Sequence, residues 1–286
     1  MISEEQFHKE IELIIANAIR EDVGDGDHSS LACIPKDAMG KAKLLVKDQG
    51  VIAGVAFAKQ VFSHIDKDMK VETRIEDGAQ VKYGDIVFYV EGASQSILKA
   101  ERLVLNAMQR MSAIATKTKT FVDLLEGTGT KILDTRKTTP GIRALEKWAV
   151  KIGGGENHRF ALYDMIMLKD NHIDFAGGIT KAIHKTKDYL KATGRDLKII
   201  VEARSLDEIK EILQAEGVYR ILIDNFNYED TRTAVKLIGD TCLTESSGGI
   251  NEKTLRLYAE CGVDYISSGA LTHSVYNMDL SLKAVE

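Results

Sequence analysis

The first third of the chain alternates between helical and strand-like patterns of apolar residues. Apolar positions near the N-terminus recur at helical spacing, and Ser3 stands where it can cap that helix. These positions are Phe7, Ile11, Ile14, Ile15 and Ala18. We predict that the helix ends before Glu21 and that strand-like runs follow, at 42–46, 51–53, 71–75 and 86–90, with a helix at 56–65 among them. The pattern indicates a small α+β unit on a mostly antiparallel sheet.

The rest of the chain follows a different rhythm, which begins after a long predicted helix at 97–125. Six short apolar runs then appear, each closed by a polar residue, with helical segments between most of them. The runs are 132–134, 166–169, 199–202, 221–224, 242–245 and 265–268, and the helical segments are 179–192, 205–215, 228–238 and 251–261. From residue 199 onward the strands repeat about every 22 residues, the spacing of βα units in a barrel.

Two α/β architectures fit this rhythm. In a barrel, the C-terminal ends of all strands meet at one mouth, where the active site lies. In a doubly wound open sheet, a G-x-G-x-x-G fingerprint after the first strand binds a nucleotide. That fingerprint is absent and only about six strands are recognisable, so the sequence favours an open or incomplete α/β barrel.

Composition narrows the class of protein. The chain has 286 residues, of which 44% are hydrophobic and 28% charged, and its net charge is −5, which argues against a nucleic-acid partner. No apolar run is long enough to span a membrane, and the acidic N-terminus does not read as a signal peptide. Cys33, Cys242 and Cys261 are odd in number and widely spaced. They are expected to be reduced thiols in a cytoplasmic protein.

The predicted mouth has a basic sector and an acidic sector. The basic sector contains Arg136, Lys137, His158, Arg159 and Lys169. Such a group can clamp carboxylates, which arginine binds through two parallel hydrogen bonds. The acidic sector contains Glu202 and Asp224, which can hold sugar hydroxyls or Mg²⁺.

The last two strand ends run into glycines, a pattern that predicts a phosphate site. Glycine allows backbone N–H groups to approach a phosphate, and the loops after the last two strands are the usual phosphate site of such barrels. The residues concerned are Ser247, Gly248, Gly249, Ser268 and Gly269. The alternative is that Gly-Gly simply leads into a helix without binding a ligand.

Other motifs carry no catalytic assignment. The acidic loop at 21–27 lacks the closing glutamate of an EF-hand, and no histidine pair has metal-binding spacing. There is no G-x-S-x-G nucleophile elbow. His172 is interpreted as a residue that orients Lys169 or Asp170 and stays outside the catalytic set. A turn-flanked hairpin at 77–85 is similar to carrier domains but presents no distinctive lysine, so it is interpreted as structural.

Several blocks of sequence resemble the quinolinate phosphoribosyltransferases, also called carboxylating nicotinate-nucleotide pyrophosphorylases. The most specific are Arg-Lys-Thr-Thr-Pro-Gly at 136–141 and Asn-His-Arg at 157–159. Further matches lie at 21–24, 50–54, 146–150, 168–173 and 271–274, so the resemblance covers nearly the whole chain. Trp148 stands where tyrosine is common, and Asp-His-Ser-Ser at 27–30 differs from the usual Asp-Ile-Thr-Thr; neither departure touches the motif positions.

The resemblance implies a fold, a reaction and a set of residues. The expected fold is an N-terminal α/β sandwich at 1–111 packed on an open α/β barrel at 112–270, with 271–286 returning to the sandwich. The expected reaction transfers phosphoribose from 5-phosphoribosyl 1-pyrophosphate to quinolinate with decarboxylation, on the route to NAD, with Mg²⁺ carried by the substrate near the acidic sector. The implied catalytic residues are Lys137, Lys169, Glu202 and Asp224.

Further contacts follow from the same resemblance. Thr135 and the basic sector are expected to bind substrate, and Ser247, Gly248, Gly249, Ser268 and Gly269 to bind phosphate. A homodimer is expected, in which Arg102 completes the site of the partner subunit. Two other functions stay open: a related barrel transferase, such as the molybdenum-transport-associated homologue, and a noncatalytic anion-binding barrel.

Overall fold

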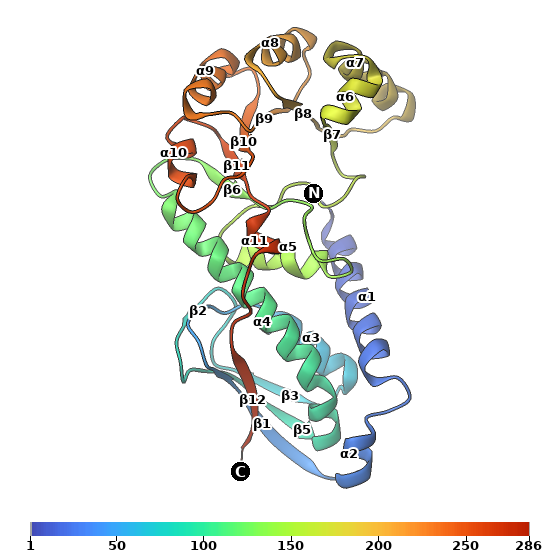
Figure 1. The fold of residues 1–286 in the computed structure, drawn as a ribbon. Coiled ribbons are helices and arrows are strands. Elements are labelled where there is room, and N and C mark those ends of the chain that lie inside the picture. The colour runs from blue at the N-terminus through green and yellow to red at the C-terminus, as the bar shows by residue number, and fades with distance from the viewer. Residues whose placement is uncertain (1, 286) are drawn as a thin grey trace. The chain divides into compact units, whose positions relative to one another are not determined.

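A computed structural model describes residues 2–285 (Figure 1). The chain forms two compact units, each assembled from separate stretches of sequence. The barrel unit consists mainly of Thr120–Lys137 and Gly155–Ala270; the antiparallel unit consists mainly of Ser3–Lys119, Thr138–Gly154 and the segment from Leu271 onward. The expected domain boundary after residue 111 stays a prediction.

The antiparallel unit is built on a four-stranded sheet. Its strand order is β12-β1-β5-β3, and every neighbouring pair is antiparallel, as the sequence predicted for the first third of the chain. The strands are β1 (Met39–Val46), β3 (Lys70–Thr73), β5 (Ile86–Ala93) and β12 (Leu280–Val285). β2 (Gly50–Val51) and β4 (Gln80–Val81) form a separate pair. The C-terminal strand therefore closes one edge of a sheet whose other strands come from the first third.

The helices of this unit begin and end close to the predicted positions, with exceptions. They are α1 (Glu4–Val23), α2 (His28–Cys33), α3 (Val55–Ile65), α4 (Ser94–Leu124), α5 (Arg143–Ile152) and α11 (Ala270–His273), of which α4 and α11 each share residues with the barrel unit. Ser3 caps α1 by accepting the N–H of Gln6 at 3.1 Å. The prediction that α1 ends before Glu21 was wrong: exposed acidic residues are tolerated on a helix surface, and the helix continues to Val23. Asp27 caps α2 rather than contributing to a calcium loop.

Aromatic and small residues together pack this unit. Phe62 and Phe88 are fully buried and meet edge to face, with ring centroids 5.9 Å apart. Gly153, at the end of α5, lies against α4, and a Cβ there would be 2.4 Å from the Ala115 carbonyl oxygen. The glycine is thus required by the close approach of the two helices, not by a ligand.

The barrel unit contains a six-stranded, fully parallel sheet with the order β6-β11-β10-β9-β8-β7. The strands are β6 (Lys131–Leu133), β7 (Ile166–Leu168), β8 (Ile199–Ala203), β9 (Arg220–Asp224), β10 (Leu243–Ser247) and β11 (Tyr265–Ser267). The first two strands of the unit lie at opposite edges and do not pair with each other in the described residues. The prediction of an open α/β barrel is therefore confirmed.

Helices connect these strands and lie on one side of the sheet (Figure 1). They are α6 (Asp170–Ala176), α7 (Ile179–Thr193), α8 (Leu206–Ala215), α9 (Tyr228–Ile238) and α10 (Leu255–Ala259). The helix predicted at 251–261 is reduced to α10, because Asn251 begins a turn in which its carbonyl accepts the N–H of Thr254 at 3.0 Å. The stretch after Gly249 is consequently a loop rather than an immediate helix start.

The strand register separates two faces of the parallel sheet. Glu202 is paired with Leu222, which is paired with Glu245, which is paired with Tyr265. Because side chains alternate along each strand, these four residues share one face, here called the inner face. The opposite face carries apolar side chains such as Val201 that are fully buried. The polar residues of the sheet are thus concentrated on the inner face.

Two further structural findings bear on the class of protein. No helix within residues 2–285 is both long enough and apolar enough to cross a membrane. All three cysteines are free thiols; Cys33 is exposed and Cys261 is buried. The prediction of reduced thiols agrees with this arrangement.

Candidate functional site

Carboxylates from two neighbouring strands lie on the inner face, near their C-terminal ends. The register that pairs Glu202 with Leu222 places Asp224 two residues further along on the same face. The side chain of Glu202 is only 8% exposed, and its Oε2 lies 3.1 Å from Nζ of Lys169. Lys169 follows β7 directly and is 47% exposed. The structure therefore brings together a base and an acid of the predicted mouth from strands β7 and β8.

His172 has the orienting role that the sequence suggested. Its Nδ1 accepts the backbone N–H of Lys169 at 3.0 Å, within the first turn of α6. The ring thereby fixes the backbone from which the Lys169 side chain extends.

The loop with the Asn-His-Arg motif is held against β6. Residue Glu156 forms a parallel bridge with Leu133, and its N–H donates to the Ile132 carbonyl at 2.9 Å. The fully buried carboxylate of Asp134 then accepts the N–H of His158 at 2.8 Å and the side-chain amide of Asn157 at 2.6 Å. The edge strand of the sheet thus positions the loop through backbone pairing and a buried carboxylate.

Arg159 is a buried cation with surplus positive charge beside it. The residue is 6% exposed, and its Nη1 donates to the Met165 carbonyl at 3.2 Å. Burial lowers the pKa of its guanidinium, the charge of Arg136 lowers that pKa further, and Asp164 partly opposes both. Two positive groups held this close favour an anionic ligand that neutralises them.

Arg136 and Lys137 extend from the loop after β6. Both are exposed. The predicted substrate residue Thr135 shapes this loop, since its hydroxyl accepts the N–H of Lys137 at 3.0 Å. Two residues further on, in the antiparallel unit, the N–H of Thr139 donates to the fully buried carboxylate of Glu146 at 3.0 Å. Short-range hydrogen bonds thus shape the Arg-Lys-Thr-Thr segment on both sides of its two cations.

The predicted phosphate loop after β10 is packed tightly against the end of β9. Gly248 has a φ of +102°, and a Cβ there would lie 2.1 Å from Oδ1 and 2.9 Å from the backbone N of Asn225. Asn225 itself has a φ of +58° and donates its side-chain amide to Asp224 at 2.7 Å. Gly248 is therefore linked by packing to a predicted catalytic carboxylate.

We expect Gly248→Ala to reduce kcat/KM by about 100-fold, because the new Cβ displaces Asn225 and with it Asp224. Circular dichroism should show the fold retained. Gly239→Ala is the matched control, since Gly239 also has a positive φ but open space around its Cβ position. Equal losses in the two variants would attribute the effect to backbone strain alone.

The second predicted phosphate loop uses some of its polar groups internally. The N–H of Ser268 donates to the Leu133 carbonyl at 3.0 Å, and its hydroxyl contacts the Ile250 carbonyl at 3.3 Å. Ser268 thus connects the ends of β11 and β6. Gly269 precedes α11, a helix of only four residues, so a strong helix dipole does not contribute here.

Sequence reasoning missed two charged residues of the inner face. Arg220 begins β9, and Glu245 lies in the middle of β10; both are buried and are ion-paired at 2.7 Å. Burial alone would raise the pKa of Glu245, but the hydrogen bond and charge of His158 and the charge of Arg220 lower that pKa to about 2. An arginine that opens an otherwise apolar strand was the available signal for this pair.

Arg102 lies in the antiparallel unit and is separate from these groups in the sequence. It projects from α4 with 69% of its side chain exposed, and its Nη2 lies 3.8 Å from Oε1 of Glu101. A solvent-exposed pair at this distance contributes about 1 kcal/mol or less to stability. The arginine is thus available for contacts beyond those seen in one chain.

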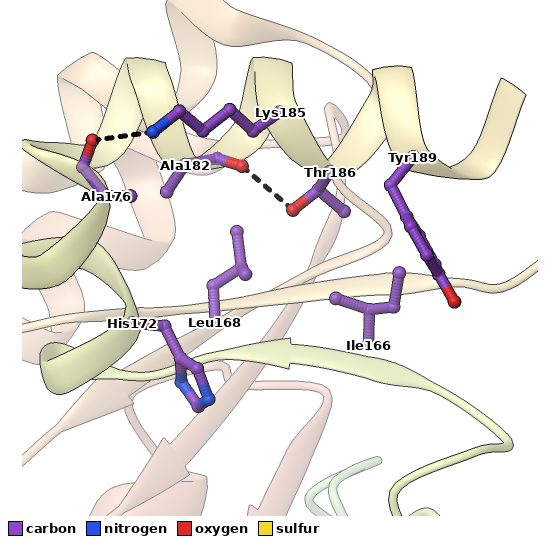
Figure 2. Close-up of a pocket in the computed structure, with 8 residues that line it drawn as sticks. All are labelled: Ile166, Leu168, His172, Ala176, Ala182, Lys185, Thr186 and Tyr189. Carbon is purple, nitrogen blue, oxygen red and sulfur yellow. Dashed lines mark hydrogen bonds between the residues drawn. The ribbon is translucent and has the colours of Figure 1, made fainter. Parts of the chain in front are cut away.

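A hollow of about 310 Å³ lies beside β7, away from the inner face (Figure 2). Ile166 and Leu168 point toward α7, on the side of the strand opposite Met167. The hollow is lined by Ile166, Leu168, His172, Ala176, Ala182, Lys185, Thr186 and Tyr189. Its lining is mainly apolar, so it does not match the predicted anion site.

The acidic sector fits a metal ion that arrives with a substrate. Within residues 2–285, no three His, Cys, Asp or Glu side chains are gathered as a metal site. Mg²⁺ commonly binds one or two carboxylates together with substrate phosphates rather than a cage made by the protein. Glu202 and Asp224, on one face of adjacent strands, provide two such carboxylates.

An open parallel barrel with cations and carboxylates at its strand ends defines a class of α/β enzymes that bind small anionic substrates. Family models agree with a more specific assignment. The model for the C-terminal domain of quinolinate phosphoribosyl transferase matches residues 114–283, and that for its N-terminal domain matches residues 27–112. The chain therefore belongs to the quinolinate phosphoribosyltransferase family.

Individual relatives support this membership along the whole chain. A chloroplastic nicotinate-nucleotide pyrophosphorylase (carboxylating) of Arabidopsis thaliana is 43% identical over 96% of this chain and 82% of that protein. A probable enzyme of the same name from Bacillus subtilis is 39% identical over 96% of this chain and 93% of that protein. The crystal structure of NadC from Streptococcus pyogenes superposes with a TM-score of 0.89 at 36% identity, covering 100% of this chain and 99% of that one.

Proposed function

We propose that this chain transfers phosphoribose from 5-phosphoribosyl 1-pyrophosphate to quinolinate, and releases pyrophosphate and CO₂ to give nicotinate mononucleotide for NAD synthesis. Membership of the family supports this reaction. The observation within the site that supports it best is the pairing of buried Arg159 with the nearby charge of Arg136. Quinolinate is a dianion, and its two carboxylates match two adjacent guanidinium groups.

The predicted residues divide the reaction between them. Arg136, Arg159 and His158 hold quinolinate, and Lys137 and Lys169 neutralise the phosphoribosyl pyrophosphate. The ring nitrogen then attacks the anomeric carbon, and the C–O bond to pyrophosphate breaks through an oxocarbenium-like state. Glu202 and Asp224 stabilise the developing positive charge. Once the nitrogen is quaternary, the ring accepts the electron pair of the breaking C–C bond, CO₂ leaves, and a proton takes its place.

Mg²⁺ is proposed as the metal of this site. When bound, it neutralises the leaving pyrophosphate. Glu202 and Asp224 are the residues that would hold it together with substrate oxygens. The predicted phosphate contacts of Ser247, Gly248, Gly249, Ser268 and Gly269 are part of the same proposal, with Gly248 the best supported by its packing against Asn225.

The assembly and the location are proposed as well. A homodimer in which Arg102 enters the partner's site would explain an exposed arginine on a helix that is otherwise well buried. A cytoplasmic location is proposed from the free thiols. The plant relative is named as chloroplastic, so location differs within the family.

Product formation provides the test. The purified protein with quinolinate, 5-phosphoribosyl 1-pyrophosphate and Mg²⁺ should produce nicotinate mononucleotide, followed by ultraviolet absorbance and chromatography. Nicotinate is the matched control substrate, because it lacks one carboxylate and should react far more slowly. Equal rates with both substrates would contradict the dicarboxylate site.

The two competing functions predict other outcomes in the same assay. A noncatalytic anion-binding barrel would bind quinolinate in calorimetry without forming product. A transferase of the molybdenum-transport-associated type would neither bind quinolinate nor turn it over. The matches at Arg136, His158, Arg159 and Lys169 favour the quinolinate reaction over both.

A further inference from the structure

Three buried ionisable side chains form a continuous chain beneath the Asn-His-Arg loop. Nη1 of Arg220 donates to Oε2 of Glu245 at 2.7 Å, and the same oxygen lies 3.4 Å from Nε2 of His158. The side chain of Glu245 is 0% exposed and that of Arg220 is 7% exposed. Glu245 therefore cannot touch a substrate that enters from solvent, and its charge acts only on its protein neighbours.

The contacts of His158 define its protonation geometry. The backbone N–H of Arg159 donates to Nδ1 of His158 at 2.7 Å, so Nδ1 is an acceptor. In the neutral ring the proton is then on Nε2, which faces the Glu245 carboxylate. The opposite tautomer would place an N–H against the N–H of Arg159 and a lone pair against the carboxylate. Glu245 therefore selects one tautomer and one ring orientation.

The ring orientation determines how the next residue is held. Asp134 binds the backbone of His158 from β6, while Glu245 holds its ring from β10. Two buried carboxylates thus fix the residue from opposite strands, and the ring of His158 in turn receives the N–H of Arg159. The guanidinium of Arg159 is buried at the end of this chain of contacts.

We propose that Glu245, supported by Arg220, is a positioning residue that holds His158 and Arg159 in the geometry needed to receive a substrate carboxylate. This inference rests on the proposed function, because it assigns Arg159 to the carboxylates of quinolinate. It differs from the expected direct contact of His158 with substrate: here the imidazole uses both nitrogens within the protein and acts through Arg159.

Glu245→Gln is the first test, since it keeps the size of the side chain and removes its charge. We expect KM for quinolinate to rise about 10–100-fold, the range typical when a supporting residue is lost. KM for 5-phosphoribosyl 1-pyrophosphate should stay unchanged. In ¹⁵N NMR of the ligand-free protein, the signal of His158 should change from a single Nε2–H tautomer to a mixture of tautomers.

A second variant separates positioning from simple destabilisation. Glu245→Gln leaves the buried charge of Arg220 unpaired, which can weaken the fold. The double variant Arg220→Met/Glu245→Gln removes both charges and should recover melting temperature. Its quinolinate KM and its mixed His158 tautomers should nevertheless match those of Glu245→Gln. Recovery of both properties in the double variant would overturn the proposal.

Asp264→Asn is the matched control. Oδ2 of Asp264 accepts the N–H of Thr244 at 2.8 Å and its hydroxyl at 2.7 Å, so it ties β10 to the start of β11, at the end opposite the predicted mouth. This variant should lower melting temperature without changing the quinolinate KM or the His158 signal. A rise in quinolinate KM as large as that of Glu245→Gln would show that any damage to this strand pair has the same effect.

The failure of this inference can be distinguished from failure of the proposed function. If the wild-type protein forms no nicotinate mononucleotide, the proposed function fails, while the NMR measurement still tests whether Glu245 selects the tautomer. If the wild type is active and Glu245→Gln keeps its quinolinate KM and its single tautomer, only the positioning role is wrong.

Discussion

Replacement of Lys169 by alanine is expected to reduce kcat/KM by about 10²–10³-fold, the usual loss when one preorganised electrostatic group is removed from an active site. The ammonium lies 3.1 Å from the Glu202 carboxylate, at the end of β7. Its removal takes away a positive charge and leaves an almost buried negative charge without this partner. Anionic substrates would then meet a site of reversed local charge. Steady-state kinetics with both substrates would measure the loss.

The same change should cost the fold much less than it costs activity. An unpaired buried group typically lowers stability by about 1–3 kcal/mol, which leaves most of the protein folded. Lys210→Ala is the matched control, because Lys210 is also ion-paired, at 2.8 Å from Asp207, but lies on the outer helix α8. It should have no effect on turnover. If activity in Lys169→Ala simply follows the folded fraction, the lysine is structural.

Mixing two inactive variants is expected to restore activity, provided that Arg102 serves the partner's site. Arg102→Ala and Lys169→Ala would each be inactive alone. In a heterodimer one site carries both changes and the other carries neither. Random exchange at equal amounts gives about half heterodimers, each with one intact site, so activity should approach roughly a quarter of the wild-type value.

A control mixture makes this result specific. Lys137 and Lys169 belong to the same unit, so mixing Lys137→Ala with Lys169→Ala leaves one change in each site and should restore nothing. Subunit exchange in both mixtures would be verified by native mass spectrometry with isotope-labelled chains. If exchange is complete and the Arg102 mixture stays inactive, Arg102 acts within its own chain or not at all.

Apolar spacing alone was sufficient to predict the strands and the longer helices. The six predicted strands of the barrel unit all form, as do α1, α3, α4, α7, α8 and α9. These elements have several turns or a clear apolar run, so their local pattern determines them. The segments that were missed or shortened are α2, α5, α6, α10, α11 and β12. Most of them are short, and too few residues remain in a short helix to establish a period.

The polar strand ends were also predictable, because a charged residue after an apolar run has few other places to lie. Lys169, Glu202 and Asp224 occupy the ends of three neighbouring strands, as expected. The roles of these residues stay predictions. The motif blocks were sufficient to recognise the family to which the chain belongs.

Which face of the sheet carries charge was decided only by the tertiary structure. Strands of three to five residues are too short to show alternation, so the sequence could not separate the inner face from the outer one. The pairing of Arg220 with Glu245 spans 25 residues, and His158 reaches the same carboxylate from a loop held on β6. Local sequence determines whether a residue is in a strand. The partner of a buried charge is determined by strand order and register, because only these bring distant residues within contact distance.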